Sequence, residues 1–529
     1  MHMTDISPHQ NSILQGCNQK QKDIILLLAI FVLNFIVYGV DCFQHALCGD
    51  EIKELMEDVP DIYIAQRRWG IALWKECFGY GYLPFLSVII FCAANSLTAL
   101  IHTKLFGLSN NTSRFIYSVA YSVCPVLFRI LTFSELSDVF SISMLSGSLS
   151  VLFITSSTSW KQYAIAIVFA IFSLSIYQIN VFYIPTLWLA WYANSAFLSR
   201  PCSFIRESVR FCSAFIISIA IYGTIATILR NSGAAAPDVI QMIDEYQGYF
   251  SGSWKHVFEQ NSPLLILQVL VHYTIQSLPY ATGVSSLAGG SSTYTHIFLI
   301  AVSCCCVWVL IQSWFKFSYK KAILLNLLTI GVFYMPFSAY ALSAGKMYEF
   351  RMYLPCCISS AFIITLASSF ASGNKVTSKL IPIFLCLFCI KAAYTHTEAR
   401  RNSAWNFERT KLQFLEIKHH CKNIALQNGL TNYTIHLASH KWPIKSISLY
   451  NALQVAEAPF LTGVVQPFAI KHFAAYFGCG NMVRMELDDA PEEAKHILQN
   501  KPVWPNPESV FIYNGDIIVK VYEKPSKEN

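Results

Sequence analysis

The chain has 529 residues, of which 54% are hydrophobic and only 13% are charged, and its mean hydropathy is +0.43. A soluble globular protein carries about 25% charged residues, so this composition excludes an ordinary soluble enzyme. The formal net charge of +7 is modest and no basic patch resembles a groove reader, so we expect no nucleic-acid partner. Many apolar runs approach the length that crosses a bilayer, and they predict a polytopic α-helical membrane protein.

Taken in chain order, the apolar runs predict about 11 transmembrane helices. The predicted spans are residues 24–40, 83–101, 115–131, 139–155, 163–177, 181–198, 211–229, 296–314, 322–341, 353–370 and 380–394. A further apolar segment, residues 264–279, is interrupted by Gln268, His272 and Gln276. Because polar groups at membrane depth need protein or water around them, we interpret it as a re-entrant or interfacial helix within the outward segment 230–292.

The distribution of lysine and arginine between the spans predicts the orientation. Cytoplasmic connectors of membrane proteins carry excess Lys and Arg, and with a cytoplasmic N-terminus every inward connector of this chain is basic. The first outward connector, residues 41–82, is then acidic. This alternation requires that residues 264–279 do not cross, which the sequence alone leaves open. Residues 1–394 form the predicted membrane domain.

Residues 395–529 are soluble in composition and face outward in this orientation. Helical spacing over 397–429 and an alternating pattern over 433–438 predict one helix and one strand. Two further apolar stretches flank Asn514-Gly515, a dipeptide that suits the tight turn of a β-hairpin. Together these patterns predict a small α/β domain.

The first outward connector combines acids with a basic pair. Asp50 and Glu51 are carboxylates that can take a proton from a hydroxyl nucleophile. Arg67 and Arg68, followed by Trp69, carry guanidinium groups that can hold a phosphate through bidentate hydrogen bonds. The plainer alternative is a solvated loop whose arginines anchor to lipid headgroups, and composition does not separate the two interpretations.

Other outward connectors place similar groups near the same membrane surface. They are the carboxylates Glu135 and Asp138, the amide Gln178, the ring-bearing residues Trp254 and His256, and the cations Lys346 and Arg351. Acids that activate a hydroxyl, cations that hold a phosphate and rings that stack on sugars are what glycosyl transfer from a lipid phosphate requires. Each also has a plainer interpretation, because the acids suit a helix N-terminus, the cations suit interfacial anchors and Gln178 suits a break between helices.

The first outward connector reads Gly49-Asp50-Glu51 and later Arg68-Trp69-Gly70. With the multi-span plan and the late connector that carries Lys346 and Arg351, the chain resembles the membrane glycosyltransferases of the GT-C type. More narrowly, it resembles the serotype-specific O-antigen glucosyltransferases of the Gtr type-II family. The resemblance covers the whole length in outline, and it is specific mainly in the first outward connector and the hydrophilic C-terminal region.

This resemblance implies a donor, an acceptor and a location. The donor is an undecaprenyl-phosphate-linked sugar, glucose, made by a donor-lipid synthase on the cytoplasmic side and moved outward by a flippase. The acceptor is a hydroxyl of the lipopolysaccharide O-antigen repeat, whose modification changes the serotype. The chain would then lie among the lipids of the bacterial inner membrane, with its N-terminus cytoplasmic and its C-terminal domain periplasmic.

The resemblance also assigns roles to residues. It implies a catalytic acid at Asp50 or Glu51, a second acidic site at Glu135 and Asp138, and donor-phosphate contacts from Arg67, Arg68, Lys346 and Arg351. We expect contacts to the sugar or the acceptor from Trp69, Gln178, Trp254 and His256. Several acids crowd the first outward connector, so the choice of base stays open, although Asp50 is preferred. No cofactor is certain, and the need for a divalent metal also stays open.

Two alternatives remain at the level of sequence. One is another polyprenyl-phosphate-sugar-dependent transferase with a different sugar or acceptor. The other is a transporter or flippase for lipid-linked sugars. Transporters often show two related halves and ionisable residues at mid-membrane depth, whereas this chain gathers its acids at one outer surface. The sequence therefore favours the transferase, and it leaves the linkage, the modified sugar and the oligomeric state open.

Overall fold

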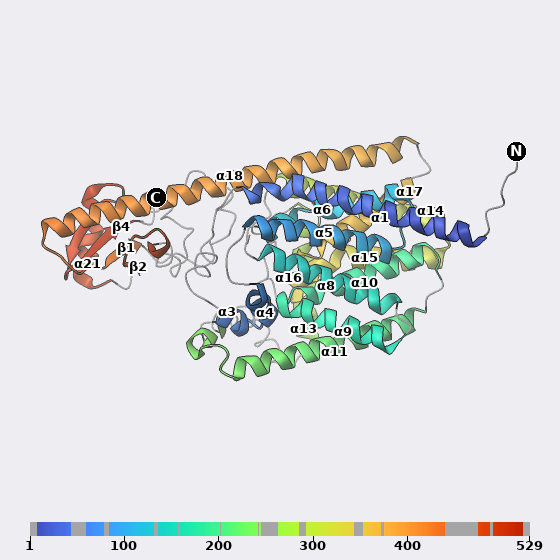
Figure 1. Cartoon of the computed structure of the whole chain (residues 1–529), viewed down its shortest axis with the longest axis horizontal. Coiled ribbons are helices and arrows are strands. Elements are labelled where there is room, and N and C mark those ends of the chain that lie inside the picture. Colours follow the sequence, from blue (N-terminus) through green and yellow to red (C-terminus); the bar gives the residue numbers. More distant parts are fainter. Residues whose placement is uncertain are drawn as a thin grey trace. The chain divides into compact units, whose positions relative to one another are not determined.

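The computed structural model describes most of the chain in two compact units (Figure 1). The described residues are 8–43, 60–78, 84–131, 136–156, 159–200, 203–241, 243–244, 263–284, 293–342, 353–371, 375–439, 474–486 and 490–521. Among them, the first unit extends to Thr397 and is helical, and the second begins at Glu398 and contains the strands.

The first unit is a bundle of apolar helices. Its elements are α1 (Pro8–Tyr38), η1 (Gly39–Cys42), α3 (Pro60–Ala65), α4 (Trp69–Phe78), α5 (Pro84–Leu105), α6 (Asn111–Ser122), α7 (Pro125–Leu131), α8 (Ser137–Ser156), α9 (Trp160–Ile176), α10 (Asn180–Phe197), α11 (Phe204–Asn231), α13 (Pro263–Ala281), α14 (Thr293–Lys316), α15 (Tyr319–Tyr334), η2 (Met335–Phe337), α16 (Ser338–Leu342), α17 (Cys356–Ala371) and the start of α18 (Lys375–Gln427). In the described part of the chain, 8 helices are long and apolar enough to cross a membrane, by length and composition. A polytopic membrane protein therefore agrees with the structure, and the number of spans stays a prediction.

One predicted span is broken where the sequence contains a proline. Residues 115–131 were expected to form a single helix, but α6 ends at Ser122 and α7 begins at Pro125. Proline lacks an amide hydrogen and crowds the preceding turn, which favours a break at this position, although α10 and α18 continue through Pro185 and Pro382. The carbonyl of Ser122 accepts from the Tyr38 hydroxyl, and the carbonyl of Val123 accepts from the Tyr294 hydroxyl. These two tyrosines satisfy the groups that the break exposes and attach α1 and α14 to it.

Helices α5, α6, α8 and α10 share a polar core. The ring nitrogens of His102 lie 2.8 Å from the Tyr117 hydroxyl and 2.8 Å from the Ser148 hydroxyl. Ser148 in turn lies 3.1 Å from the hydroxyl of Tyr183, and all four residues are buried. Buried polar groups are normally hydrogen-bonded, and this network satisfies them while it fixes the helices against one another. Ser143 and Ser148 of α8 contact Asn180 and Tyr183 of α10, so these two helices run in the same direction. Tyr183 and Asn194 of α10 contact His102 and the Phe106 carbonyl, so α5 also runs in this direction and α8 begins toward the start of α5.

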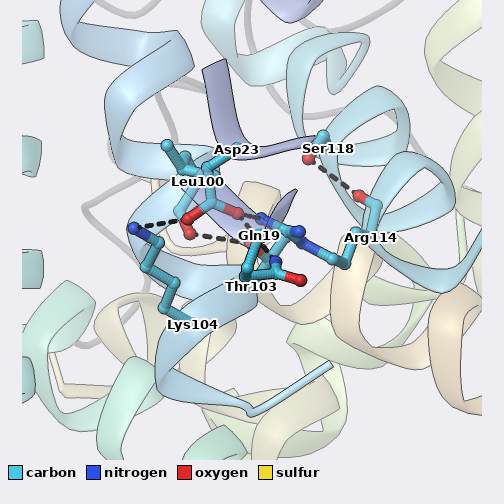
Figure 2. A network of polar contacts seen from close by, with 7 residues as sticks. All are labelled: Gln19, Asp23, Leu100, Thr103, Lys104, Arg114 and Ser118. Atoms are coloured by element: carbon cyan, nitrogen blue, oxygen red, sulfur yellow. Dashed lines mark hydrogen bonds and ion pairs between the residues drawn. The ribbon is translucent and has the colours of Figure 1, made fainter. Parts of the chain in front are cut away.

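The C-terminal end of α5 carries an ion network centred on Asp23 (Figure 2). Asp23 of α1 lies 2.9 Å from Nζ of Lys104 and 2.5 Å from Nη2 of Arg114, and the Gln19 amide donates to it at 3.0 Å. Only 3% of the Arg114 side chain is exposed. Two cations and an amide therefore occupy both oxygens of one carboxylate and join α1, α5 and α6.

Helix α13 coincides with the segment interpreted as re-entrant or interfacial. The Ser277 hydroxyl lies 2.7 Å from that of Tyr334, and the rings of Tyr273 and Tyr280 pack against Tyr340. By length and composition α13 also qualifies as a span. Its position in a membrane stays a prediction.

The second unit contains a four-stranded sheet in the order β2-β1-β4-β3. The strands are β1 (Ile435–Ser439), β2 (Met482–Glu486), β3 (Val510–Tyr513) and β4 (Asp516–Lys520), with α21 (Glu492–Asn500) and η7 (Pro507–Ser509). Strand β1 is parallel to both neighbours, and β3 pairs antiparallel with β4. Asn514 and Gly515 have φ of 53° and 87°, so the predicted hairpin is confirmed together with its turn. Phe414, Ile417 and Cys421 of α18 supply the helical side of the core.

Helix α18 differs from the expected division of the chain. A span over 380–394 and a separate helix over 397–429 were predicted, but one helix of 53 residues runs from Lys375 to Gln427. No glycine or proline interrupts residues 383–428, and Gly429, with φ of 67°, follows the helix. A change from apolar to polar composition alters what surrounds a helix without ending it, which is why the sequence pattern misled.

Candidate active site

After residue 43, the described part of the connector predicted to face outward is the helical pair α3 and α4 with the turn 66–68 between them. Helix α4 packs on α9, and a Cβ added to Gly70 would collide with the Oγ of Ser175. Glycine therefore permits the close approach of the two helices. This contact brings the beginning of α4 to the end of α9, next to the short link between α9 and α10.

That link holds the turn before α4. The amide of Gln178 donates to the Gln66 carbonyl at 2.8 Å, and its oxygen accepts from Nε of Arg68 at 3.2 Å. The Arg68 guanidinium also lies 5.4 Å from the ring centroid of Tyr177. From α11, the hydroxyl of Tyr222 donates to the Arg67 carbonyl at 3.0 Å. Two of the three arginines predicted to bind the donor phosphate, Arg67 and Arg68, therefore lie on a turn held by the α9–α10 link and by α11.

Helix α3 is held by the segment that follows α11. Oδ2 of Asp61 accepts from the Ala236 amide at 3.3 Å, and Ala65 is buried with neighbours from the same segment. Nη2 of Arg230 lies 2.5 Å from Oδ1 of Asp244, and this bond holds the pKa of that carboxyl below its ordinary value. The contacts of Asp61 and Ala65 therefore hold α3, the helix that precedes Arg67 and Arg68, against this segment.

Asp138, in the first turn of α8, contacts α4 at Trp74, one turn after Gly70. Oδ2 of Asp138 accepts from Nε1 of Trp74 at 3.2 Å, and the residue is only 8% exposed. Its Oδ1 is buried and, within the described residues, has no hydrogen-bond partner. Lys75, 5% exposed, follows Trp74 and acts electrostatically on Asp138. The carboxylate thus keeps one oxygen open beside a buried cation.

Trp69 begins α4 and was expected to contact the sugar or the acceptor. Its indole nitrogen is buried and, among the residues that can be described, has no hydrogen-bond acceptor. Buried donors are seldom left without a partner. An unused donor and an unused acceptor, on Trp69 and Asp138, therefore belong to neighbouring elements of one site.

A buried acid–histidine pair lies at the end of α1. Nε2 of His396 donates to Oδ2 of Asp41 at 2.8 Å, and the two side chains are 3% and 0% exposed. The ring centroids of Tyr38 and Phe128 lie 5.4 and 5.5 Å from the centroid of the His396 imidazole. The sequence did not distinguish Asp41 from the other acids of the first outward connector, and no motif singled out His396. The contacts of Trp74 with Asp138 and of Tyr222 with Arg67 were missed as well, because these partners are far apart in the sequence.

The remaining predicted site residues fall outside the described part of the chain. They are Asp50, Glu51, Glu135, Trp254, His256, Lys346 and Arg351. Of the others, Arg68 is hydrogen-bonded to Gln178, Trp69 begins α4, and Asp138 contacts α4 through Trp74. Across the described ranges, no group of three or more His, Cys, Asp or Glu side chains could hold a metal ion. The need for a metal stays open.

The helices and this site define a membrane-protein class: a bundle of apolar helices in which short helices present a basic turn beside a partly unsatisfied carboxylate. Residues 43–366, more than half of the chain, match the family glucosyl transferase GtrII, and the chain belongs to that family. The predicted membership is confirmed, and it makes the protein a glucosyltransferase. No curated protein matches the chain. The matched region includes the basic turn and Asp138, and it excludes His396.

Proposed function

We propose that the protein transfers glucose from undecaprenyl-phosphate glucose to a hydroxyl of the lipopolysaccharide O-antigen repeat, on the periplasmic side of the bacterial inner membrane. The family supports glucosyl transfer, and the apolar helices support a donor that resides in lipid. A basic turn suits a donor whose leaving group is a phosphate, because guanidinium groups bind phosphate oxygens through paired, charge-assisted hydrogen bonds.

The open oxygen of Asp138 is the observation that carries this proposal. Leaving a buried acceptor unsatisfied costs free energy, so this position is expected to receive a ligand in the working enzyme. An acceptor hydroxyl or a divalent ion would each satisfy it. Because Trp74 holds the other oxygen, the carboxylate is oriented before any ligand arrives.

The proposed reaction is a single displacement. A carboxylate takes the proton of the acceptor hydroxyl while that oxygen forms a bond to the anomeric carbon of glucose. The bond from this carbon to the phosphate oxygen breaks with its electron pair, and undecaprenyl phosphate leaves. Asp50 is the preferred base, Asp138 belongs to the second acidic site, and Arg67 and Arg68 stabilise the charge on the departing phosphate.

Purified protein in liposomes tests the proposal directly. With radiolabelled undecaprenyl-phosphate glucose and O-antigen, we expect labelled glycan in the absence of any ion gradient. A transporter would move the lipid and form no product. Labelled UDP-glucose is the matched control donor: transfer from it, and none from the lipid, would refute the proposed donor. Mass spectrometry of glycans from cells with and without the protein should show one added hexose.

A further inference from the structure

The turn between α3 and α4 places an arginine where glycine is usual. Arg67 has φ of 62°, in the left-handed region that ends many helices and that bulky side chains avoid. Asn514, in the hairpin turn, shares this conformation, but asparagine tolerates it far better. Strained backbone of this kind persists only where its surroundings enforce it, and it concentrates at functional sites.

The main-chain groups around Arg67 are hydrogen-bonded, whereas its side chain acts on Asp244 only electrostatically. Its amide donates to the Ile64 carbonyl at 2.9 Å, and its carbonyl accepts from Tyr222 at 3.0 Å. The next amide, of Arg68, donates to the Tyr63 carbonyl at 2.6 Å. The Arg67 side chain is exposed, and within the described residues its guanidinium has no hydrogen-bond partner. The fold therefore fixes the backbone of Arg67 and leaves its charge available.

Gln178 holds both flanks of this arginine with one side chain. Its amide donor reaches the carbonyl of Gln66, and its amide oxygen accepts from Arg68. Gln178 was expected to contact the sugar or the acceptor, but both ends of its amide are engaged by protein. Loss of this side chain would free the turn on both sides of the strained residue.

We propose that Arg67 binds the phosphate of the lipid donor and that Gln178 is a positioning residue that holds Arg67 in place for it. The inference rests on the proposed function for the identity of the donor. A residue whose backbone is held in one conformation, on a turn braced from α9–α10 and α11, meets a bound phosphate with little rearrangement of the main chain. This lowers the entropy lost on binding.

Binding of undecaprenyl phosphate to the full-length protein in detergent tests the inference without requiring catalysis. Uncharged undecaprenol is the control ligand. Arg67→Gly relieves the backbone strain and removes the guanidinium, so we expect an unchanged or higher melting temperature. Affinity for undecaprenyl phosphate should fall about tenfold or more, as expected for loss of a charged hydrogen-bonding pair, and affinity for undecaprenol should not change.

Gln178→Ala should weaken phosphate binding several-fold, with Gln162→Ala on the same helix pair as the matched control. In the Arg67→Gly background, most of this loss should disappear, because a residue that acts through Arg67 has nothing left to position. In turnover, both variants should raise KM for the lipid donor more than they lower kcat. A purely structural role of Gln178 would instead give equal losses in both backgrounds.

The outcomes separate this inference from the proposed function. Transfer from undecaprenyl-phosphate glucose with wild-type phosphate affinity in Arg67→Gly would overturn the inference and leave the function standing. Phosphate-dependent binding that requires Arg67, without any glucose transfer, would sustain the phosphate site and refute the function. A wild-type protein that binds undecaprenyl phosphate no better than undecaprenol would overturn the inference.

Discussion

Two carboxylates at opposite ends of α5 are built differently. Asp23, beside the end of α5, has both oxygens occupied by cations and an additional amide (Figure 2). Asp138, at the start of α8, accepts from one indole, and its second oxygen has no hydrogen-bond partner among the residues that the structure describes. Both oxygens of Asp23 are engaged by protein groups, which fits a structural role. The oxygen of Asp138 without a partner among the described residues makes that acid our candidate for chemistry.

The largest effect is expected at Asp138. Asp138→Asn keeps the volume and an oxygen for Trp74 but removes the charge, so glucose transfer should fall about 100-fold or more. The melting temperature should not fall, because a neutral amide replaces a buried charge. Initial rates of transfer per folded molecule in liposomes measure the effect. Transfer at the wild-type rate would show that the open oxygen has no catalytic use.

Asp23 should give the reverse result. Asp23→Ala leaves the buried Arg114 without its counter-charge, which should cost about 3 kcal/mol of stability. Glucose transfer per folded molecule should stay at the wild-type level. Denaturant unfolding in detergent measures the first quantity, and Asp23→Leu combined with Arg114→Met should recover much of the loss. Loss of transfer in Asp23→Ala without a loss of stability would contradict the structural role of Asp23.

A third acid, in the second unit, should show the smallest effect. The Thr434 amide, at 2.8 Å, and His436, at 3.1 Å, hold the pKa of Asp516 below its ordinary value. A lowered folded pKa adds stability that is present above the unfolded value of about 3.9 and is lost as the pH falls through the folded value. Because the side chain is 41% exposed, solvent reduces the contribution to about 1 kcal/mol or less.

Hydrogen exchange of the β1 and β4 amides in the full-length protein measures this effect. After correction for intrinsic exchange rates, protection should be lower at pH 3 than at pH 7. In Asp516→Asn this difference should shrink, because no carboxylate remains to be protonated at that position. An unaltered pH dependence in the variant would assign the acid sensitivity to other groups.

Local patterns were sufficient for part of the molecule. Apolar runs located most helices, and Asn514-Gly515 located the hairpin, because these signals depend on neighbouring residues. The break at Pro125 was not readable with the same ease, because proline can either kink or end a helix, and α10 continues through Pro185 and α18 through Pro382. Strand β2 had no comparable signal, and it is defined mainly by its pairing with β1.

The candidate site was predictable only in its ingredients. Charge patterns singled out Arg67, Arg68 and Asp138 from the sequence. The partners that define their roles, Gln178 holding the turn and Trp74 orienting the acid, are 110 and 64 residues away along the chain. Only packing determines such pairs. A glutamine between two helices therefore suggested a sugar contact, although the fold uses it as a brace.

The pair between Asp41 and His396 has a consequence for the order of events during synthesis of the protein. The two residues are separated by 355 positions, and the ribosome makes the chain from its N-terminus. The Asp41 carboxylate must therefore wait through the insertion of every intervening helix before this partner exists. A carboxylate without this partner resists burial, so the end of α1 should stay hydrated during translation and dehydrate only when α18 arrives. Packing of α18 against the end of α1 would then be a late step of biogenesis. A chain that is released before residue 396 is made would keep Asp41 hydrated.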